Sequence, residues 1–139
     1  MNGGIFGVGT DLASVVRIGQ ALERHGDGFA ARILCGAEMD EYHAHRHKAA
    51  FLAKRFAAKE AIAKALGTGI GAELGFGDMY IVHEAAGRPG VVFHGEGEAT
   101  RRRLGIGRVH LSISDERRYA TAFAVAERER PLHGAIFAR

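Results

Sequence analysis

Two carboxylates in unlike settings carry the chemistry that this sequence offers. Asp11 follows the apolar segment 5–10, and Glu60 lies within the lysine-rich segment 54–64, KRFAAKEAIAK. One carboxylate from each segment can bind a divalent cation, because hard divalent cations prefer oxygen ligands such as carboxylates. The lysines around Glu60 would then hold phosphate oxygens. This combination predicts a phosphoryl-type transfer.

The same segment also permits plainer interpretations. Glu60 and Lys64 are four residues apart, and on a helix this spacing gives an ordinary surface ion pair that contributes about 0.3 kcal/mol. Arg55 and Lys59 fall within the apolar arc of the same helix, so they either extend out of the core or line a cleft that receives an anion. The sequence alone does not choose between these interpretations.

The hydrophobic pattern places most helices early in the chain and most strands late. Helices are expected at 12–25, opened by Asp11, and at 29–34, 37–46, 48–66 and 96–104. Strands are expected at 5–10, 76–84, 91–94, 108–114 and 119–127, the last two joined as a hairpin. This order predicts the α+β class, with a mostly antiparallel sheet packed with the long central helix.

Composition limits the class of protein. At 139 residues and 47% hydrophobic content, the chain is expected to form a single domain, 1–139, in which 128–139 looks like an added tail. The single Cys35 has no disulfide partner within the chain, and neither a cleavable leader nor a membrane-spanning run is visible, so we expect a cytoplasmic protein. The net charge of +3 suits an acidic partner but does not choose between nucleic acid, a phosphorylated cofactor and an acidic protein.

Two glycine-rich segments resemble nucleotide-binding loops without matching them. The run 67–71, GTGIG, follows the long predicted helix, and its small residues would let backbone amides approach a ligand phosphate. It lacks the spacing and the lysine of a P-loop, and the pair Gly7 and Gly9 lacks the last glycine of a dinucleotide fingerprint. A nucleoside-triphosphatase or dinucleotide-binding function is therefore disfavoured.

Histidines and arginines supply weaker candidates. His110 stands on the polar side of the alternating segment 109–114, where a lone histidine is more often structural than catalytic. No serine has the surroundings of a nucleophile elbow, so a serine-hydrolase triad is disfavoured. His43 and His47 have a helical metal-ligand spacing but no evident third ligand, so a solvated helix end is expected. The three arginines at 101–103 are likewise expected to form a solvated face.

Four separate segments form a distinctive series. They are GVGTDL at 7–12, FLAKRFAAKEA at 51–61, KALGTG at 64–69 and HLSISD at 110–115. In order and spacing they resemble the holo-[acyl-carrier-protein] synthase family, the short bacterial type of 4′-phosphopantetheinyl transferase. The likeness extends to about residue 127, and Asp115 is a mild departure, since family members often have a histidine there.

The resemblance implies a transferase that moves 4′-phosphopantetheine from coenzyme A to a serine of apo-acyl carrier protein, in fatty-acid or polyketide biosynthesis, and releases adenosine 3′,5′-bisphosphate. It also implies Mg²⁺ as cofactor, a homotrimer, and an active site at each subunit interface. Nucleic acid is not expected as a partner, because Asp11 and Glu60 would repel phosphate unless a cation intervened. A membrane is not expected as a partner either. A domain that binds coenzyme A or nucleic acid without chemistry is the alternative, and metal dependence separates the two.

By matching position, the resemblance assigns roles to single residues. Asp11 and Glu60 would ligate Mg²⁺, Lys64 would contact the phosphate under attack, and His110 would lie beside the bound nucleotide. We hypothesise that Glu60 also removes the serine proton by way of a water molecule. Further coenzyme A contacts would come from Arg55, Gly67, Thr68, Gly69, Arg88 and Pro89.

Two arginines on the first predicted helix are candidates for binding the carrier protein. Arg17 and Arg24 are seven residues apart, on nearly the same side of that helix. Acyl carrier proteins are acidic helical bundles, so these arginines are expected to steer one into place. The alternative is that they serve only solubility.

Overall fold

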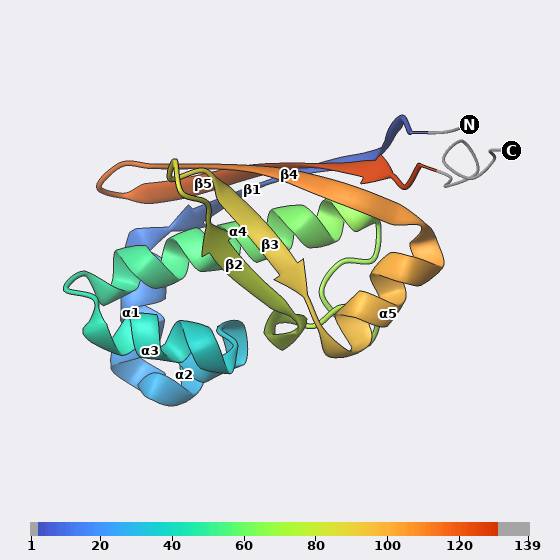
Figure 1. Cartoon of the computed structure of the whole chain (residues 1–139). Coiled ribbons are helices and arrows are strands. Elements are labelled where there is room, and N and C mark those ends of the chain that lie inside the picture. The colour runs from blue at the N-terminus through green and yellow to red at the C-terminus, as the bar shows by residue number, and fades with distance from the viewer. Residues whose placement is uncertain (1–2, 131–139) are drawn as a thin grey trace, which may run out of the picture.

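One long helix lying on a sheet forms the frame of the molecule, of which the computed structural model describes residues 3–130. The helix is α4 (Lys48–Leu66), and it packs against a three-stranded antiparallel sheet with the strand order β1-β5-β4. The strands are β1 (Ile5–Ser14), β4 (Ile106–Asp115) and β5 (Tyr119–Arg128). Figure 1 shows α4 running along one face of this sheet.

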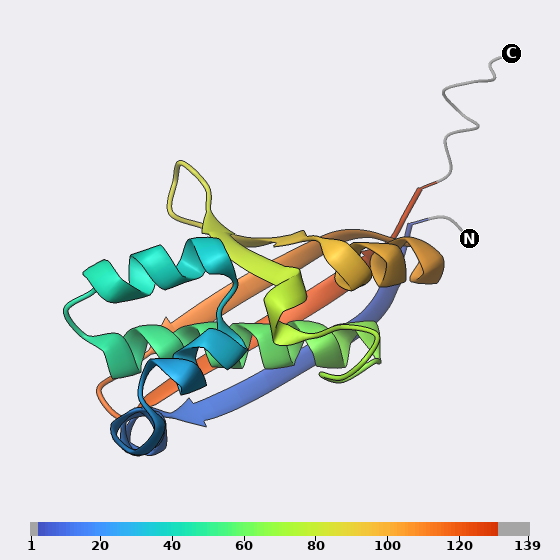
Figure 2. The same ribbon diagram turned by 90° about the horizontal axis from the view of Figure 1, so that it is seen from below.

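The remaining elements surround α4 on its other sides. They are α1 (Val15–His25), α2 (Asp27–Ile33), α3 (Gly36–Ala44), the 3₁₀ turn η1 (Phe76–Asp78), β2 (Met79–His83), β3 (Pro89–Phe93) and α5 (Gly95–Leu104). The first three helices gather at one end of the molecule and α5 lies at the other (Figures 1 and 2). No helix within residues 3–130 is both long enough and apolar enough to cross a lipid bilayer.

The α+β class and the β4–β5 hairpin are confirmed, and every strand pair in the described chain is antiparallel. The strands form two sheets, because β2 and β3 pair only with each other. The strand predicted at 76–84 starts later, at Met79, because Asp78 accepts a hydrogen bond from Gly75 N (2.8 Å) and closes a turn first.

Small side chains let the sheet lie close to α4. The residues of β5 that face the helix are all alanines, and all are buried: Ala120, Ala122, Ala124 and Ala126. The opposite, outer face of the sheet is apolar yet open to solvent, with Leu12 64%, Val8 54% and Phe123 48% exposed. The register places these three side chains on the same face, because Val8 lies opposite Val125 and Thr10 opposite Phe123.

The first strand is longer than the sequence predicted. β1 continues through Asp11 to Ser14, whose Oγ accepts a hydrogen bond from Arg17 N (3.2 Å) and caps α1. The prediction that Asp11 opens this helix is therefore wrong. The ladder with β5 extends to the pair Ser14 and Tyr119, so strand pairing overrides the local capping preference of Asp11.

Lys59 is an internal charge of the fold. Its side chain is fully buried, and its Nζ donates to Glu38 Oε1 (2.6 Å), Ile33 O (2.8 Å) and Phe76 O (3.0 Å). Burial lowers the pKa of Lys59, and the charge of Glu38 partly offsets this effect. Both sequence-based alternatives for Lys59 are wrong, since it neither extends to solvent nor lines an anion cleft.

Candidate active site

Asp11, Glu60 and Lys64 meet where β1 crosses α4. Lys64 Nζ donates to Thr10 O (2.9 Å) and to Asp11 Oδ1 (3.2 Å). Glu60 lies one helical turn before Lys64. The plainer interpretation, an ordinary Glu60–Lys64 ion pair, is wrong, because Lys64 pairs with Asp11 and Glu60 forms no ion pair within residues 3–130. The structure thus brings the three residues together, but Lys64 pairs with Asp11 and not with Glu60.

Two glycines make this approach possible. A Cβ at Gly9 would overlap the carbonyl oxygen of Ala61 and lie 2.7 Å from Ala65 N, and a Cβ at Gly7 would overlap the carbonyl oxygen of Ala65. Side chains two residues apart on a strand share a face, so Asp11 points toward α4 as these glycines do. The glycines therefore let β1 rest on the helix backbone and place Asp11 against α4.

The two carboxylates are only partly neutralised. Asp11 Oδ2 is buried and has no hydrogen-bond partner. The pKa of Glu60 is raised above its ordinary value of 4.5, first by burial and then by the charge of Asp11, while Lys64 opposes the shift. A divalent cation would satisfy the orphaned oxygen and remove the repulsion, so the pair fits Mg²⁺. Within residues 3–130, no cluster of three or more His, Cys, Asp or Glu side chains is placed to hold a metal, so its other ligands would be waters and substrate oxygens.

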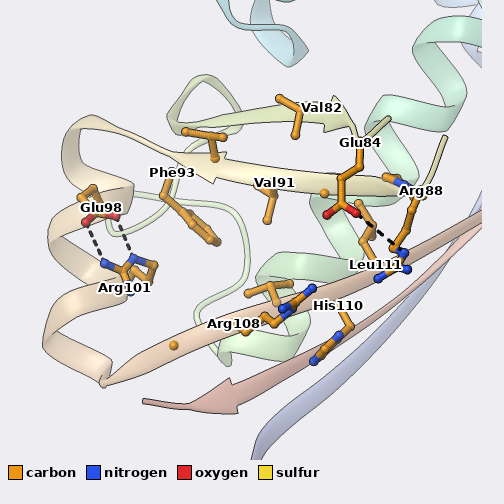
Figure 3. A pocket seen from close by; sticks show the side chains of 15 residues that line it. Val82, Glu84, Arg88, Val91, Phe93, Glu98, Arg101, Arg108, His110 and Leu111 are labelled. Carbon is orange, nitrogen blue, oxygen red and sulfur yellow. Dashed lines mark hydrogen bonds and ion pairs between the residues drawn. The ribbon is translucent and has the colours of Figure 1, made fainter. Parts of the chain in front are cut away.

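A second part of the predicted site lies around a cavity of about 760 Å³ between β3, β4 and α5. Arg88 and Pro89 line it from the β2–β3 hairpin, and His110 lies at its rim on β4 (Figure 3). Arg108, two residues before His110, also lines this cavity and was missed in the sequence. Its position on the same strand as His110 was the only available signal.

His110 and the carboxylate pair lie on opposite faces of the sheet. His110 is directly opposite Val125, on the outer face, whereas Asp11 is opposite the buried Ala122, on the α4 face. The Nε2 of His110 lies 3.4 Å from Glu127 Oε2, a neighbour that the sequence did not suggest. A single subunit therefore does not gather all the predicted catalytic residues at one point.

Arg55 is held mainly by the protein itself. Its guanidinium donates to Ile81 O (3.0 Å) and to Glu41 Oε1 (2.9 Å), and it lies over the ring of Phe51 at 4.5 Å from the centroid. It also borders a cavity of about 320 Å³ that Pro89 lines from the other side. Arg55 thus follows the cleft alternative in part, with two of its five N–H donors taken by Ile81 and Glu41.

The segment from Gly67 to Gly69 ends α4 and does not form an amide cradle. The N–H of Gly67 donates to Lys64 O (3.0 Å), and those of Thr68 and Gly69 donate to Ala63 O (3.2 Å each). Gly67 has the left-handed conformation that this cap requires, with φ 80°. These amides satisfy the helix carbonyls, and the negative end of the helix dipole disfavours an anion here. Other contacts of this segment with coenzyme A stay a prediction.

The remaining candidates have simple outcomes. Arg17 and Arg24 are both exposed on α1, without an ion pair in the described chain, and Arg17 borders an apolar groove that contains Phe29 and Phe56. His43 and His47 are exposed, as expected of a solvated helix end.

The expectation for the arginines at 101–103 is wrong for Arg101. This residue is half-buried, and its Nε lies 2.8 Å from Glu98 Oε1. Its hydrogen bonds and those of Arg102 lower the pKa of Glu98 to about 2. Arg101 is therefore part of the wall of the cavity between β3, β4 and α5.

Residues 7–124 match the model of the 4′-phosphopantetheinyl transferase superfamily. The match covers most of the chain, and it includes both carboxylates of the candidate site. This chain belongs to that superfamily.

Within the superfamily, the chain falls in the holo-[acyl-carrier-protein] synthase family. It is 47% identical to the synthase of Vibrio cholerae serotype O1 (strain M66-2) over 124 residues, which is 89% of this chain and 98% of that protein. It is 48% identical to the synthase of Halorhodospira halophila over 121 residues, or 87% and 96% of the two chains.

Solved structures agree with this assignment. The synthase from Neisseria meningitidis superposes with a TM-score of 0.86 at 42% identity and covers 90% of this chain and 100% of its own. The synthase from Helicobacter pylori, in complex with coenzyme A, superposes with a TM-score of 0.75 at 30% identity, covering 86% and 98%.

Proposed function

We propose that this protein transfers 4′-phosphopantetheine from coenzyme A to a serine of apo-acyl carrier protein and releases adenosine 3′,5′-bisphosphate. The observation that carries this proposal is the convergence of Asp11, Glu60 and Lys64 where β1 crosses α4. The coenzyme A complex of the related Helicobacter pylori synthase supports the donor, and the name of the relatives supports the acceptor. The carrier protein would serve fatty-acid or polyketide synthesis.

In the proposed reaction, the serine Oγ attacks the phosphorus that bears the pantetheine arm. A new P–O bond forms, and the bond to the adenosine 3′,5′-bisphosphate leaving group breaks. Lys64 would hold an oxygen of the attacked phosphate, which stabilises the charge that develops there. Glu60 would accept the serine proton by way of a water. His110 would hold the nucleotide part of coenzyme A.

Asp11 and Glu60 are the residues that would hold Mg²⁺. The orphaned oxygen of Asp11 and the raised pKa of Glu60 support this assignment. When bound, the cation neutralises the negative charge of the pyrophosphate.

We also propose a homotrimer whose active sites lie between subunits. One argument is the exposed apolar outer face around Val8, Leu12 and Phe123, since such faces usually mark association. The second argument is that His110 lies apart from the carboxylate pair of its own subunit. In a trimer, a neighbouring subunit would place its own His110 near this pair. Light scattering of Phe123→Asp tests this, with a monomer expected. If the variant still forms a trimer, the subunit interface lies elsewhere on the molecule.

The protein partner would be an acidic carrier protein that docks on α1 through Arg17 and Arg24. Both arginines are exposed and lack an ion pair within residues 3–130, which supports a role in binding. We place the reaction in the cytoplasm, where carrier protein and coenzyme A would meet it.

The decisive experiment is intact-mass spectrometry of apo-acyl carrier protein incubated with this protein, coenzyme A and Mg²⁺. We expect a gain of one phosphopantetheine group, which disappears with a chelator and with Asp11→Ala. Glu60→Gln should lower turnover by at least about 100-fold. No gain by the unmodified protein, with coenzyme A still bound, would favour a binding domain without chemistry.

A further inference from the structure

Lys64 contacts one oxygen of the carboxylate at which a divalent cation would bind. Its ammonium contacts β1 twice, at Thr10 O (2.9 Å) and at Asp11 Oδ1 (3.2 Å). The other oxygen of the same carboxylate, Oδ2, is buried and unpartnered. The Lys64 side chain is 51% exposed and that of Asp11 is 16% exposed, so the ammonium reaches the carboxylate from the solvent side.

An ammonium and a divalent cation at one carboxylate repel each other strongly, because both are positive and only one negative charge separates them. Thr10 and Asp11 take two of the three donors of Lys64, so only one donor is left for a phosphate in this position. The four-carbon stem of Lys64 is flexible and its three donors rotate freely. A movement of this side chain away from Asp11 would therefore also free its donors for a phosphate.

We propose that Lys64 is a displaceable counter-cation, which neutralises Asp11 until a divalent cation replaces it and then turns to the phosphate of the donor. This rests on the proposed function. Thermodynamic linkage makes the effect reciprocal: a phosphate that draws Lys64 away opens Asp11 to the cation, and a cation that displaces Lys64 strengthens phosphate binding. Lys64 thus couples the two binding events in addition to contacting the phosphate.

Two other lysines of α4, Lys54 and Lys59, lack this combination of features. Lys59 is fully buried and its three donors are all used, so it has no freedom to exchange. Lys54 lies 3.9 Å from Asp115 and both side chains are exposed to a similar extent, at 36% and 42%. Of these three lysines, only Lys64 contacts a carboxylate that retains a buried oxygen without a partner.

Calorimetric titration with Mg²⁺ alone, without coenzyme A, tests the exchange. Lys64→Met and Lys64→Gln should bind Mg²⁺ about three- to tenfold more tightly than the unmodified protein, because neither has to break the ion pair or bring two cations together. Lys54→Met removes the same charge from the same helix and should leave Mg²⁺ affinity unchanged. Equal or weaker binding by both Lys64 variants, with thermal unfolding midpoints close to that of the unmodified protein, would overturn the proposal.

Two further measurements separate this proposal from the proposed function. Adenosine 3′,5′-bisphosphate should tighten Mg²⁺ binding by the unmodified protein more than by Lys64→Met, and Asp11→Asn should remove Mg²⁺ binding. If Lys64→Met leaves Mg²⁺ affinity unchanged while the unmodified protein still transfers phosphopantetheine to the carrier protein, the exchange is wrong and the function stands. If the exchange is observed but no carrier protein gains mass, the function is wrong. If Mg²⁺ binds to no variant, the exchange and the metal site are both wrong.

Discussion

Lys59 and Glu60 are neighbours on α4, yet their surroundings differ in every electrostatic respect. Lys59 is fully buried, and its ammonium donates to a carboxylate and two carbonyl oxygens. Its partner Glu38 is also fully buried and accepts hydrogen bonds from Cys35 N and Ile81 N (2.9 Å each). Glu60 has no ion pair within residues 3–130 and lies beside Asp11, which repels it.

The difference separates charges that hold the fold together from charges that await a ligand. The Lys59–Glu38 pair ties α4 to α3, β2 and η1, and a fully satisfied buried pair has nothing left to offer a substrate. In the Asp11–Glu60 pair one oxygen of Asp11 has no partner, and burial together with the charge of Asp11 raises the pKa of Glu60, which costs stability. Incomplete neutralisation of this kind is common at functional sites.

The largest expected effect comes from removing the charge of Lys59, whose hydrogen bonds are all satisfied. Lys59→Met leaves Glu38 charged, buried and without its main partner, so we expect a loss of about 3–5 kcal/mol in the free energy of unfolding, measured with urea. Adding Glu38→Leu should recover only part of this loss, because it removes the unpaired charge but leaves Cys35 N and Ile81 N without their acceptor. If Lys59→Met unfolds like the unmodified protein, the pair does not hold the fold.

The second prediction concerns a substitution that moves Asp11 away from Glu60. Gly9→Ala drives a Cβ into the carbonyl oxygen of Ala61 and pushes β1 away from α4, which moves Asp11 off Glu60. We expect transferase activity to fall about 100-fold, because a shift of about 1 Å at a reacting centre has this effect. Stability should drop by about 1–3 kcal/mol. Gly28→Ala is the control, since a Cβ there meets nothing within 4 Å; equal activity of the two variants would show that the close approach is not required.

The sequence predicted the elements well because their signals are local. The α4 range 48–66 was predicted to the residue, since its apolar arc and the glycine at its end are encoded in the segment itself. The position of Asp11 within β1 was mispredicted, because a ladder with residues more than 100 positions away decided it. Local patterns carry no information of that kind.

The candidate site was predicted in its members and mispredicted in their pairing. Residue types indicated Asp11, Glu60 and Lys64, but helical spacing paired Lys64 with Glu60, and the structure pairs it with Asp11. The role of Lys59 was also missed, because its partner Glu38 lies on another helix and no local pattern indicates their contact. Which charges are satisfied is a property of packing between distant segments.

The third prediction extends the comparison to surface arginines. Arg17 of α1 has no ion pair within residues 3–130, whereas Arg102 of α5 pairs with Glu98 at 3.0 Å at the opposite end of the molecule (Figure 1). Arg17→Glu should raise KM for the carrier protein about three- to tenfold and leave KM for coenzyme A unchanged, and the difference should shrink at high salt. Arg102→Glu reverses the same charge and should change neither value. Unchanged carrier-protein kinetics in Arg17→Glu would remove α1 from the docking surface.

The smallest expected effect concerns the stability that the folded protein loses when Glu60 is ionised. Because its pKa is raised in the folded protein, the folded state holds this proton more tightly than the unfolded chain does. The cost is therefore absent below the ordinary pKa of 4.5, grows as the pH rises through the raised value, and stays constant above it.

Replacing the ionisable group should remove this cost. Glu60→Gln should raise the free energy of unfolding by about 0.5 kcal/mol at about pH 8 without divalent cations, and by less at about pH 4.5. Urea unfolding at both pH values checks this, with Glu23→Gln, an exposed residue of α1, as the control that should show no such gain. A gain at low pH only, or a loss at pH 8, would mean that ionised Glu60 does not lower the stability of the folded protein. A variant that is more stable and less active would place Glu60, unlike its neighbour Lys59, among the residues that serve the reaction at the expense of the fold.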